Sequence, residues 1–207
     1  MHDVFRLGFI LMAICAVAAA ALAYVNDITE EKIAYQRQLE QERALERVLP
    51  GCEEFKDETE KIGAYIPEGQ GEKDFGIVQG AYVGYSKGRP SGLAVRVAPT
   101  GYGGPVEMMV GISSEGIVKG LVILGQQETP GLGAKIASPE FGKRFEGKRV
   151  GGRVRVEKDG GDVQAITGAT ISSRAVARGV DVALRLFEAV SKKGLSEVRS
   201  QKEGVVP

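Results

Sequence analysis

The sequence is poor in histidine, and this scarcity excludes several classes of enzyme. The single histidine of the 207-residue chain is His2, and tryptophan is absent. A Ser–His–Asp triad, a histidine-rich metal site and a histidine acid–base pair all need imidazoles inside a folded domain, so none of them fits. The chain also lacks net charge, with 27 basic and 27 acidic residues. It therefore lacks the strongly basic character of a nucleic-acid-binding protein.

Cysteine is also scarce, whereas glycine is abundant. Cys15 lies in an apolar run and Cys52 follows a Pro-Gly pair, so the two form neither a C-x-x-C motif nor zinc-ligand spacing. We expect both thiols to be unpaired. Glycine supplies 29 of the 207 residues, about twice its usual share. No Gly-X-Y period accompanies it, so glycines are expected in turns and at close backbone approaches.

One long uncharged run lies near the N-terminus, from Leu7 to Val25. As a helix it would measure about 28 Å, close to the ~30 Å hydrocarbon thickness of a bilayer. Ala21-Leu22-Ala23 offers an A-x-A cleavage site, but the run exceeds the apolar core typical of a signal peptide. A lipoprotein signal needs a small residue before Cys15, where this chain has Ile14. The run therefore predicts an uncleaved membrane anchor.

The charges around this run predict its orientation. Arg6 precedes it, whereas Asp27, Glu30 and Glu31 follow it before the next lysine. The positive-inside rule then places the N-terminus in the cytoplasm and nearly all of the remaining chain outside.

A charged segment rich in helix formers, Asp27–Leu49, follows and stops at Pro50-Gly51. It reads as a solvated stalk that continues the membrane helix, or alternatively as a contact face for partner subunits. We divide the chain into an anchor (1–26), a helical stalk (27–50), a folded domain (51–193) and a flexible tail (194–207).

The folded domain has the pattern of short strands and glycine turns. A helix over Ser172–Lys193, with one apolar face, is expected to stop at Gly194. A short helix over Ser138–Phe145 begins with Ser138 as N-cap and a proline after it. Lys87–Gly92 reads as a turn, and Ser113–Gly116 as a hairpin turn. The fold class is α+β, with antiparallel strands packed by the C-terminal helix. Strands are expected at Ile77–Tyr85, Leu93–Ala98, Val106–Ile112, Ile117–Leu124, Val154–Glu157 and Val163–Ile166.

The junction before the last helix is the best candidate site. Thr167-Gly168-Ala169-Thr170 stands between the strand ending at Ile166 and the helix. Helix N-termini present unpaired N–H groups and a positive dipole end, which suit a phosphate. Gly168 permits a sharp turn, Thr170 supplies a hydroxyl, and Arg174 lies one turn further on. By itself the same pattern also describes an ordinary helix cap.

The string ITGATISSR resembles the flavinylation motif, [S/T]-G-A-T, of the FMN-binding domain family. In that family the last threonine of the motif is esterified to the phosphate of FMN, which corresponds to Thr170 here. Two further stretches are similar to the family, Gly101–Pro105 and Glu128–Gly133 with Lys135. Together with the single N-terminal span, they resemble the G subunits of Rnf (Rsx) electron-transport complexes. The family commonly has an aspartate six positions before the threonine, where this chain has Gln164.

The resemblance implies a redox subunit of an ion-translocating oxidoreductase that passes electrons through a covalent FMN. It implies electron flow between ferredoxin and NAD, coupled to sodium-ion or proton translocation, in the inner membrane. Implied partners are the other membrane and iron–sulfur subunits and a flavin transferase, and the flavin domain lies outside the cytoplasm. No residue is expected to act as a catalytic acid or base. The expected FMN-binding residues are Thr170 as the ester, with Thr167, Gly168, Ala169, Arg174, Glu128, Thr129, Gly131, Leu132, Gly133, Lys135 and Tyr102.

Two alternatives remain open from the sequence. One is the C subunit of the sodium-translocating NADH:quinone reductase, which shares the domain and the anchor. That protein is usually longer and carries S-G-A-T, whereas Thr167 occupies the first motif position here. The other is a membrane-anchored interaction module without a cofactor.

Overall fold

The computed structural model describes residues 2–62 and 72–203 and divides the chain into two compact units, Met1–Glu42 and Arg43–Pro207. The first unit is helical, because helix α1 runs without a break from His2 to Val48. Within α1, Val4–Glu30 has a mean hydropathy of 2.4 and is long enough to cross a membrane. Its large apolar side chains are exposed in the protein alone. They therefore suit contact with lipid.

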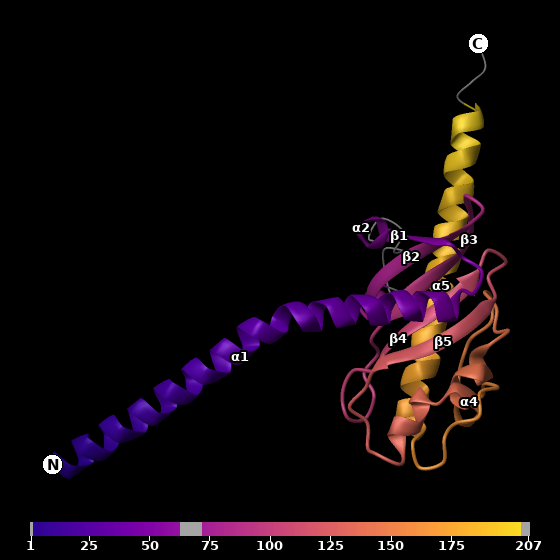
Figure 1. Cartoon of the computed structure of the whole chain (residues 1–207). Coiled ribbons are helices and arrows are strands. Elements are labelled where there is room, and N and C mark those ends of the chain that lie inside the picture. Colours follow the sequence, from indigo (N-terminus) through magenta and orange to yellow (C-terminus); the bar gives the residue numbers. More distant parts are fainter. Residues whose placement is uncertain (1, 63–71, 204–207) are drawn as a thin grey trace. The chain divides into compact units, whose positions relative to one another are not determined.

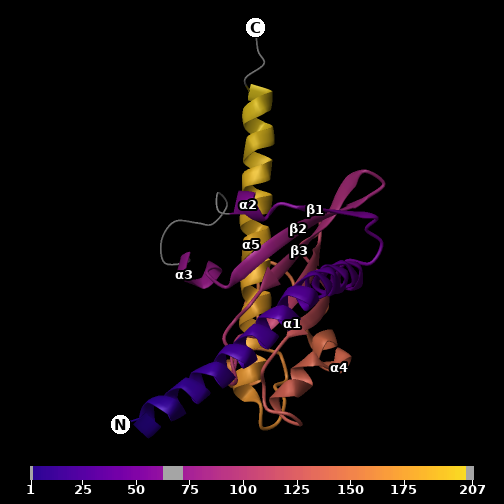
Figure 2. The ribbon, with the colours of Figure 1, turned by 60° about the vertical axis from the view of Figure 1, so that its left-hand side comes forward.

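The second unit is built on an antiparallel sheet in which the strands follow one another in sequence order, β1-β2-β3-β4-β5 (Figure 1). Figure 2 shows the first three strands side by side. This arrangement confirms the α+β class and the four principal strands expected from the sequence. The strands are β1 (Glu54–Asp57), β2 (Val78–Ser86), β3 (Arg89–Val97), β4 (Glu107–Ser113) and β5 (Val118–Gly125).

The turn between β2 and β3 is shorter than the sequence suggests. Lys87 and Gly88 both have positive φ, at 50° and 72°, as a two-residue hairpin turn requires. Ser86 pairs directly with Arg89. The predicted turn over Lys87–Gly92 is therefore wrong beyond Gly88, because Pro90 and its neighbours continue the strand. The hairpin expected between β4 and β5 is present.

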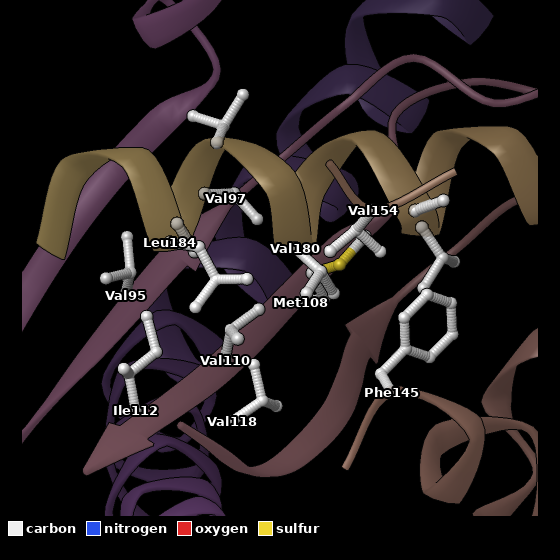
Figure 3. Packing of buried hydrophobic residues seen from close by; sticks show 14 of the residues in the cluster. Val95, Val97, Met108, Val110, Ile112, Val118, Phe145, Val154, Val180 and Leu184 are labelled. Carbon is white, nitrogen blue, oxygen red and sulfur yellow. The ribbon is translucent and has the colours of Figure 1, made fainter. Parts of the chain in front are cut away.

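One face of the sheet packs against α5 (Thr170–Glu203). Val180 and Leu184 of α5 lie over Val95, Val110 and other strand side chains in the main core (Figure 3). Burial of each such side chain contributes about 1.5–3 kcal/mol. This core therefore fixes where α5 lies, and with it the junction at Thr170.

The opposite face of the sheet receives the last turns of α1. Leu45 and Val48 are buried there with Ala94 and Met109. A Cβ on Gly111 would lie 2.1 Å from the carbonyl oxygen of Val48, so the helix approaches the sheet backbone directly. The end of the predicted stalk thus packs on its own domain, and α1 ends next to the Pro50-Gly51 break as expected.

Short helices connect these layers. Ser138 caps α4 by accepting a hydrogen bond from the N–H of Phe141, with Pro139 at the first helical position, which confirms the predicted helix start. Neither cysteine forms a disulfide, and burial raises the pKa of the Cys52 thiol. The short elements are α2 (Thr59–Ile62), α3 (Glu72–Phe75), η2 (Gly133–Ala137), α4 (Pro139–Gly142), η3 (Lys143–Phe145) and η4 (Glu157–Asp159).

Two predicted strands are wrong. Val154–Glu157 and Val163–Ile166 contribute one isolated parallel bridge, between Val156 and Val163. Several of their backbone groups have partners outside the sheet. The N–H of Val154 donates to Asp181 of α5 at 3.0 Å, and the carbonyl of Val156 accepts from the N–H groups of Asp159 and Gly161. Such local and side-chain partners remove the need for a sheet neighbour.

The predicted helix end at Gly194 is also wrong, because α5 continues through it to Glu203. A glycine inside a helix costs only about 1 kcal/mol relative to alanine, and good helix formers flank this one. The segment predicted as a flexible tail is therefore helical as far as Glu203, and residues 204–207 lie outside the described part.

Candidate functional site

The start of α5 is a turn with unused hydrogen-bond donors. Gly168 has a φ of 78°, a left-handed conformation that favours glycine. The N–H of Ala169 donates to Ile166 and that of Ser173 to Ala169. The N–H groups of Thr170, Ile171 and Ser172 lie between these two bonds, and within the described residues they have no acceptor, as the first turn of a helix requires. Thr170 is the first helical residue and is partly exposed.

Lys158 lies next to this turn. Its Nζ donates a hydrogen bond to Oγ1 of Thr170 at 3.3 Å. Lys158 belongs to η4, twelve residues before the threonine, and its side chain is exposed. A lysine ammonium lies 3.3 Å from this hydroxyl, at a helix start with three free N–H groups, and both features favour an anion. Sequence reasoning missed Lys158, because no motif links a lysine at this distance to the helix start.

Arg174 is already paired. Its Nε and Nη2 donate to the two carboxylate oxygens of Asp159 at 2.7 and 2.6 Å. This fork of hydrogen bonds lowers the pKa of Asp159 and raises that of Arg174. Arg174 therefore helps to hold η4, which carries Lys158, against α5.

Glu128 connects the three segments that the sequence singled out. It is only 5% exposed. Its Oε1 accepts hydrogen bonds from the N–H groups of Tyr102 at 2.8 Å and Gly103 at 3.3 Å. Its Oε2 accepts a hydrogen bond from Oγ of Ser172 at 2.6 Å. The carboxylate thus joins the Gly101–Pro105 loop, its own loop after β5 and the first turn of α5.

The glycines of these loops make room for this carboxylate. A Cβ on Gly101 would lie 2.1 Å from Oε1 of Glu128, and one on Gly133 would lie 2.7 Å from Oε2. A Cβ on Gly103 would lie 2.0 Å from the carbonyl oxygen of Gln127. These glycines therefore allow the loops to close on Glu128, a role that the motif alone does not reveal.

Three exposed apolar side chains come from the same three segments. Tyr102 is 70% exposed, Ile171 50% and Leu132 47%. Within the described part of Arg43–Pro207, these three are the most exposed of the large hydrophobic side chains. Leu132 approaches the turn at Gly168, where a Cβ would lie 3.3 Å from its methyl group. Exposed apolar side chains gathered beside a polar turn are typical of a binding surface.

The remaining predicted residues lie around the same loops. The carbonyl of Thr129 accepts from the N–H groups of Leu132 and Ala134, and Gly131 has a φ of 76°.

Lys135 and Thr167 line a neighbouring cavity of about 410 Å³. Gln164 lines it as well, and the carbonyl of Gln164 accepts from Arg144 at 2.5 Å. Thr167 belongs to the turn before α5, so the cavity is adjacent to that turn. Lys158, which donates to Thr170, does not line the cavity.

Comparison with known proteins identifies the class. Residues 101–185 match the FMN-binding domain family, and this range contains all three segments joined by Glu128. Residues 2–48 match the RnfG N-terminal region.

The particular family follows from full-length relatives. The chain is 37% identical to the G subunit of the Na(+)-translocating ferredoxin:NAD(+) oxidoreductase complex of Acetobacterium woodii, over 91% of this chain and 94% of that protein. It is 35% identical to the G subunit of the ion-translocating oxidoreductase complex of Shewanella baltica, over 87% of each. The chain belongs to the family of G subunits of Rnf ion-translocating oxidoreductase complexes.

Membership makes the chain an FMN-binding, membrane-associated electron-transport protein. It also favours the Rnf complex over the quinone reductase that the sequence left open. Among solved structures, the C subunit of the Na(+)-translocating NADH-quinone reductase from Parabacteroides distasonis is 23% identical to this chain, with a TM-score of 0.47. The matched region covers 66% of this chain and 78% of that protein.

Proposed function

We propose that this protein carries FMN esterified to Oγ1 of Thr170 and passes electrons through it within an Rnf complex. The observation that carries the proposal is the environment of Thr170. Its hydroxyl stands at a helix start with three free N–H groups and a lysine ammonium 3.3 Å away. A phosphate diester at this hydroxyl would meet donors and positive charge without displacing any hydrogen bond between backbone groups. The residues present therefore fit a phosphorylated flavin.

The other hydroxyls near the turn suit an ester less well. Ser172 and Ser173 are 2% and 0% exposed. Their Oγ atoms donate to Glu128 and to the carbonyl of Ala169, so both are engaged inside the protein. Thr167 is exposed, but it precedes the helix and has no share in its free N–H groups. Thr170 alone among these four combines access with an anion-binding environment.

The roles of the chain follow from this placement. The N–H groups of the first turn and Lys158 hold the phosphate, while Arg174 stays on Asp159 and steadies η4. Tyr102, Leu132 and Ile171 offer apolar surface to the ring and exclude water from one of its sides. The FMN, when bound, supplies the one- and two-electron redox chemistry, so the protein needs no acid or base of its own.

The wider assignment rests on the relatives. We propose electron transfer between ferredoxin and NAD, coupled to sodium-ion or proton translocation, with the other membrane and iron–sulfur subunits as partners. A flavin transferase would attach the FMN. The charges around Val4–Glu30 support a single inner-membrane span with the N-terminus in the cytoplasm. A covalent link suits a flavin domain outside the cytoplasm, because FMN lost there would not be replaced easily.

The experiment is production of the full chain with an active flavin transferase, followed by in-gel fluorescence of the denatured protein. The proposal predicts a fluorescent wild-type band and a dark Thr170→Ala band of equal amount. Thr167→Ser, which keeps a hydroxyl residue at the first position of the motif, is the matched control and should stay fluorescent. A fluorescent Thr170→Ala band would overturn the assignment of the ester. A dark wild-type band, with a control substrate flavinylated, would favour a cofactor-free module.

A further inference from the structure

Glu128 is an acidic residue in a buried position. It is buried at 5% exposure and receives three hydrogen bonds, all from uncharged donors. No described lysine or arginine forms an ion pair with it. Both oxygens of its side chain accept hydrogen bonds, an arrangement that suits the acceptor-only carboxylate. The interior therefore holds a negative charge whose field water and cations screen only weakly.

The placement of this carboxylate connects it to the proposed flavin. Ser172, its partner at 2.6 Å, lies two residues after Thr170 in the first turn of α5. Tyr102, whose N–H it accepts at 2.8 Å, carries an exposed ring. An FMN attached at Thr170 cannot leave this neighbourhood. Added electrons on it would therefore experience the field of Glu128.

We infer that Glu128 is a positioning residue that closes the three loops on the start of α5 and lowers the midpoint potential of the flavin through its fixed negative charge. This inference rests on the proposed function in that it requires FMN at Thr170. The effect is electrostatic: a negative charge nearby opposes reduction, because reduction adds electron density to the ring. It goes beyond the expectation that Glu128 simply contacts the ring.

Two substitutions separate the charge from the hydrogen bonds. In Glu128→Gln the amide oxygen still accepts from Tyr102 and Gly103, and the amide NH₂ donates to Oγ of Ser172, which is able to accept. The charge alone is lost. Ser172→Ala keeps the charge and both backbone hydrogen bonds. Glu115→Gln is the matched control, because Glu115 is exposed in the turn beyond the far end of β4.

The test is a spectroelectrochemical titration of the flavinylated full chain in detergent. Glu128→Gln should raise the midpoint potential by at least about 30 mV, a tenfold change in a two-electron reduction equilibrium. Ser172→Ala and Glu115→Gln should stay at the wild-type potential. An unchanged potential in Glu128→Gln overturns the electrostatic part. An equal rise in Ser172→Ala also overturns it, because loop geometry would then explain both shifts.

Amide hydrogen exchange tests the positioning part on protein without flavin. Glu128→Ala should speed exchange at Tyr102 and Gly103, while exchange in β3 and β4 stays at the wild-type rate. Unchanged exchange at these two amides would overturn the loop closure. If Glu128→Ala does not fold, Glu128→Asp carries the same test, because its carboxylate is one methylene shorter and exchange at Tyr102 and Gly103 should again be faster. Because this measurement needs no flavin, failure of the ester at Thr170 would not be confused with failure of the role of Glu128.

Discussion

Nζ of Lys158 donates a hydrogen bond to Oγ1 of Thr170 at 3.3 Å, across a separation of twelve residues. The contact depends on η4 packing beside the start of α5, which the ion pair between Asp159 and Arg174 holds in place. The proposed ester would put a phosphate next to this ammonium. Because Lys158 is exposed, solvent screens such a contact and it contributes about 1 kcal/mol at most, roughly a fivefold effect.

Replacement of Lys158 should therefore slow flavin attachment. We predict that Lys158→Met reduces the initial rate of FMN incorporation by up to about fivefold, because the phosphate loses the cation beside it. Lys192→Met is the matched control, since Lys192 pairs with Glu188 elsewhere on α5, and it should incorporate FMN at the wild-type rate. The measurement is a time course of in-gel fluorescence. Equal rates for the two variants would remove Lys158 from the phosphate site.

Acid should remove the contribution of the pair between Asp159 and Arg174. The Arg174 guanidinium lowers the pKa of Asp159 below its usual value of about 3.9. The pair therefore stabilises the folded state above that usual value, and the stabilisation is lost as the pH falls through the lowered pKa. We predict that Asp159→Asn lowers the thermal midpoint at pH 7 and that the difference from wild type shrinks as the pH falls below the usual carboxyl value and through the lowered pKa of Asp159. Thermal unfolding across this range checks it, and a difference that persists in acid would contradict the assignment.

The close approach of α1 to the sheet can be tested at Gly111. A Cβ there would lie 2.1 Å from the carbonyl oxygen of Val48, a backbone atom that cannot move independently. We predict that Gly111→Ala destabilises the fold by about 1–3 kcal/mol. At Gly125 the nearest atom would lie 3.9 Å away, so Gly125→Ala should change stability by less than about 0.5 kcal/mol. Denaturant unfolding measures both, and equal effects would refute the close packing.

Position 164 gives a prediction on recognition by the transferase. The family commonly has aspartate here, whereas this chain has Gln164, whose side chain is exposed. We predict that Gln164→Asp raises the initial rate of flavin attachment at Thr170 and leaves the thermal midpoint unchanged. Asp162→Asn, two residues earlier, serves as the control for charge in this segment. A rate unchanged by Gln164→Asp would show that the transferase does not read this position.

The sequence predicts the principal strands well because each is a short run rich in apolar and β-branched residues, and turns with glycine separate these runs. Composition and turn signals of this kind in β2 to β5 depend on local chemistry, which a single sequence contains. Val154–Glu157 has the same composition but forms no strand, because Asp181 on α5 accepts its first N–H. A side-chain partner 27 residues away is a property of the packed fold, so composition does not reveal it.

The candidate site likewise combines features that the sequence predicts with features that depend on the packed fold. The turn at Gly168, the helix start and the loop from Glu128 are visible as motifs, and the structure brings Tyr102, Glu128 and the first turn of α5 together. The burial of Glu128 and the contact of Lys158 are not visible, because both depend on how separate loops pack. The sequence suggested Arg174 for the phosphate, whereas the structure pairs it with Asp159.

The proposed bond between FMN and Oγ1 of Thr170 can be located by peptide mass mapping. Trypsin should release residues 159–174, between Lys158 and Arg174, with Thr167, Thr170, Ser172 and Ser173 in one peptide. Fragmentation of this peptide from the flavinylated full chain locates the added mass. The expected result is one FMN on Thr170. FMN on Thr167, on either serine or on another peptide would contradict it.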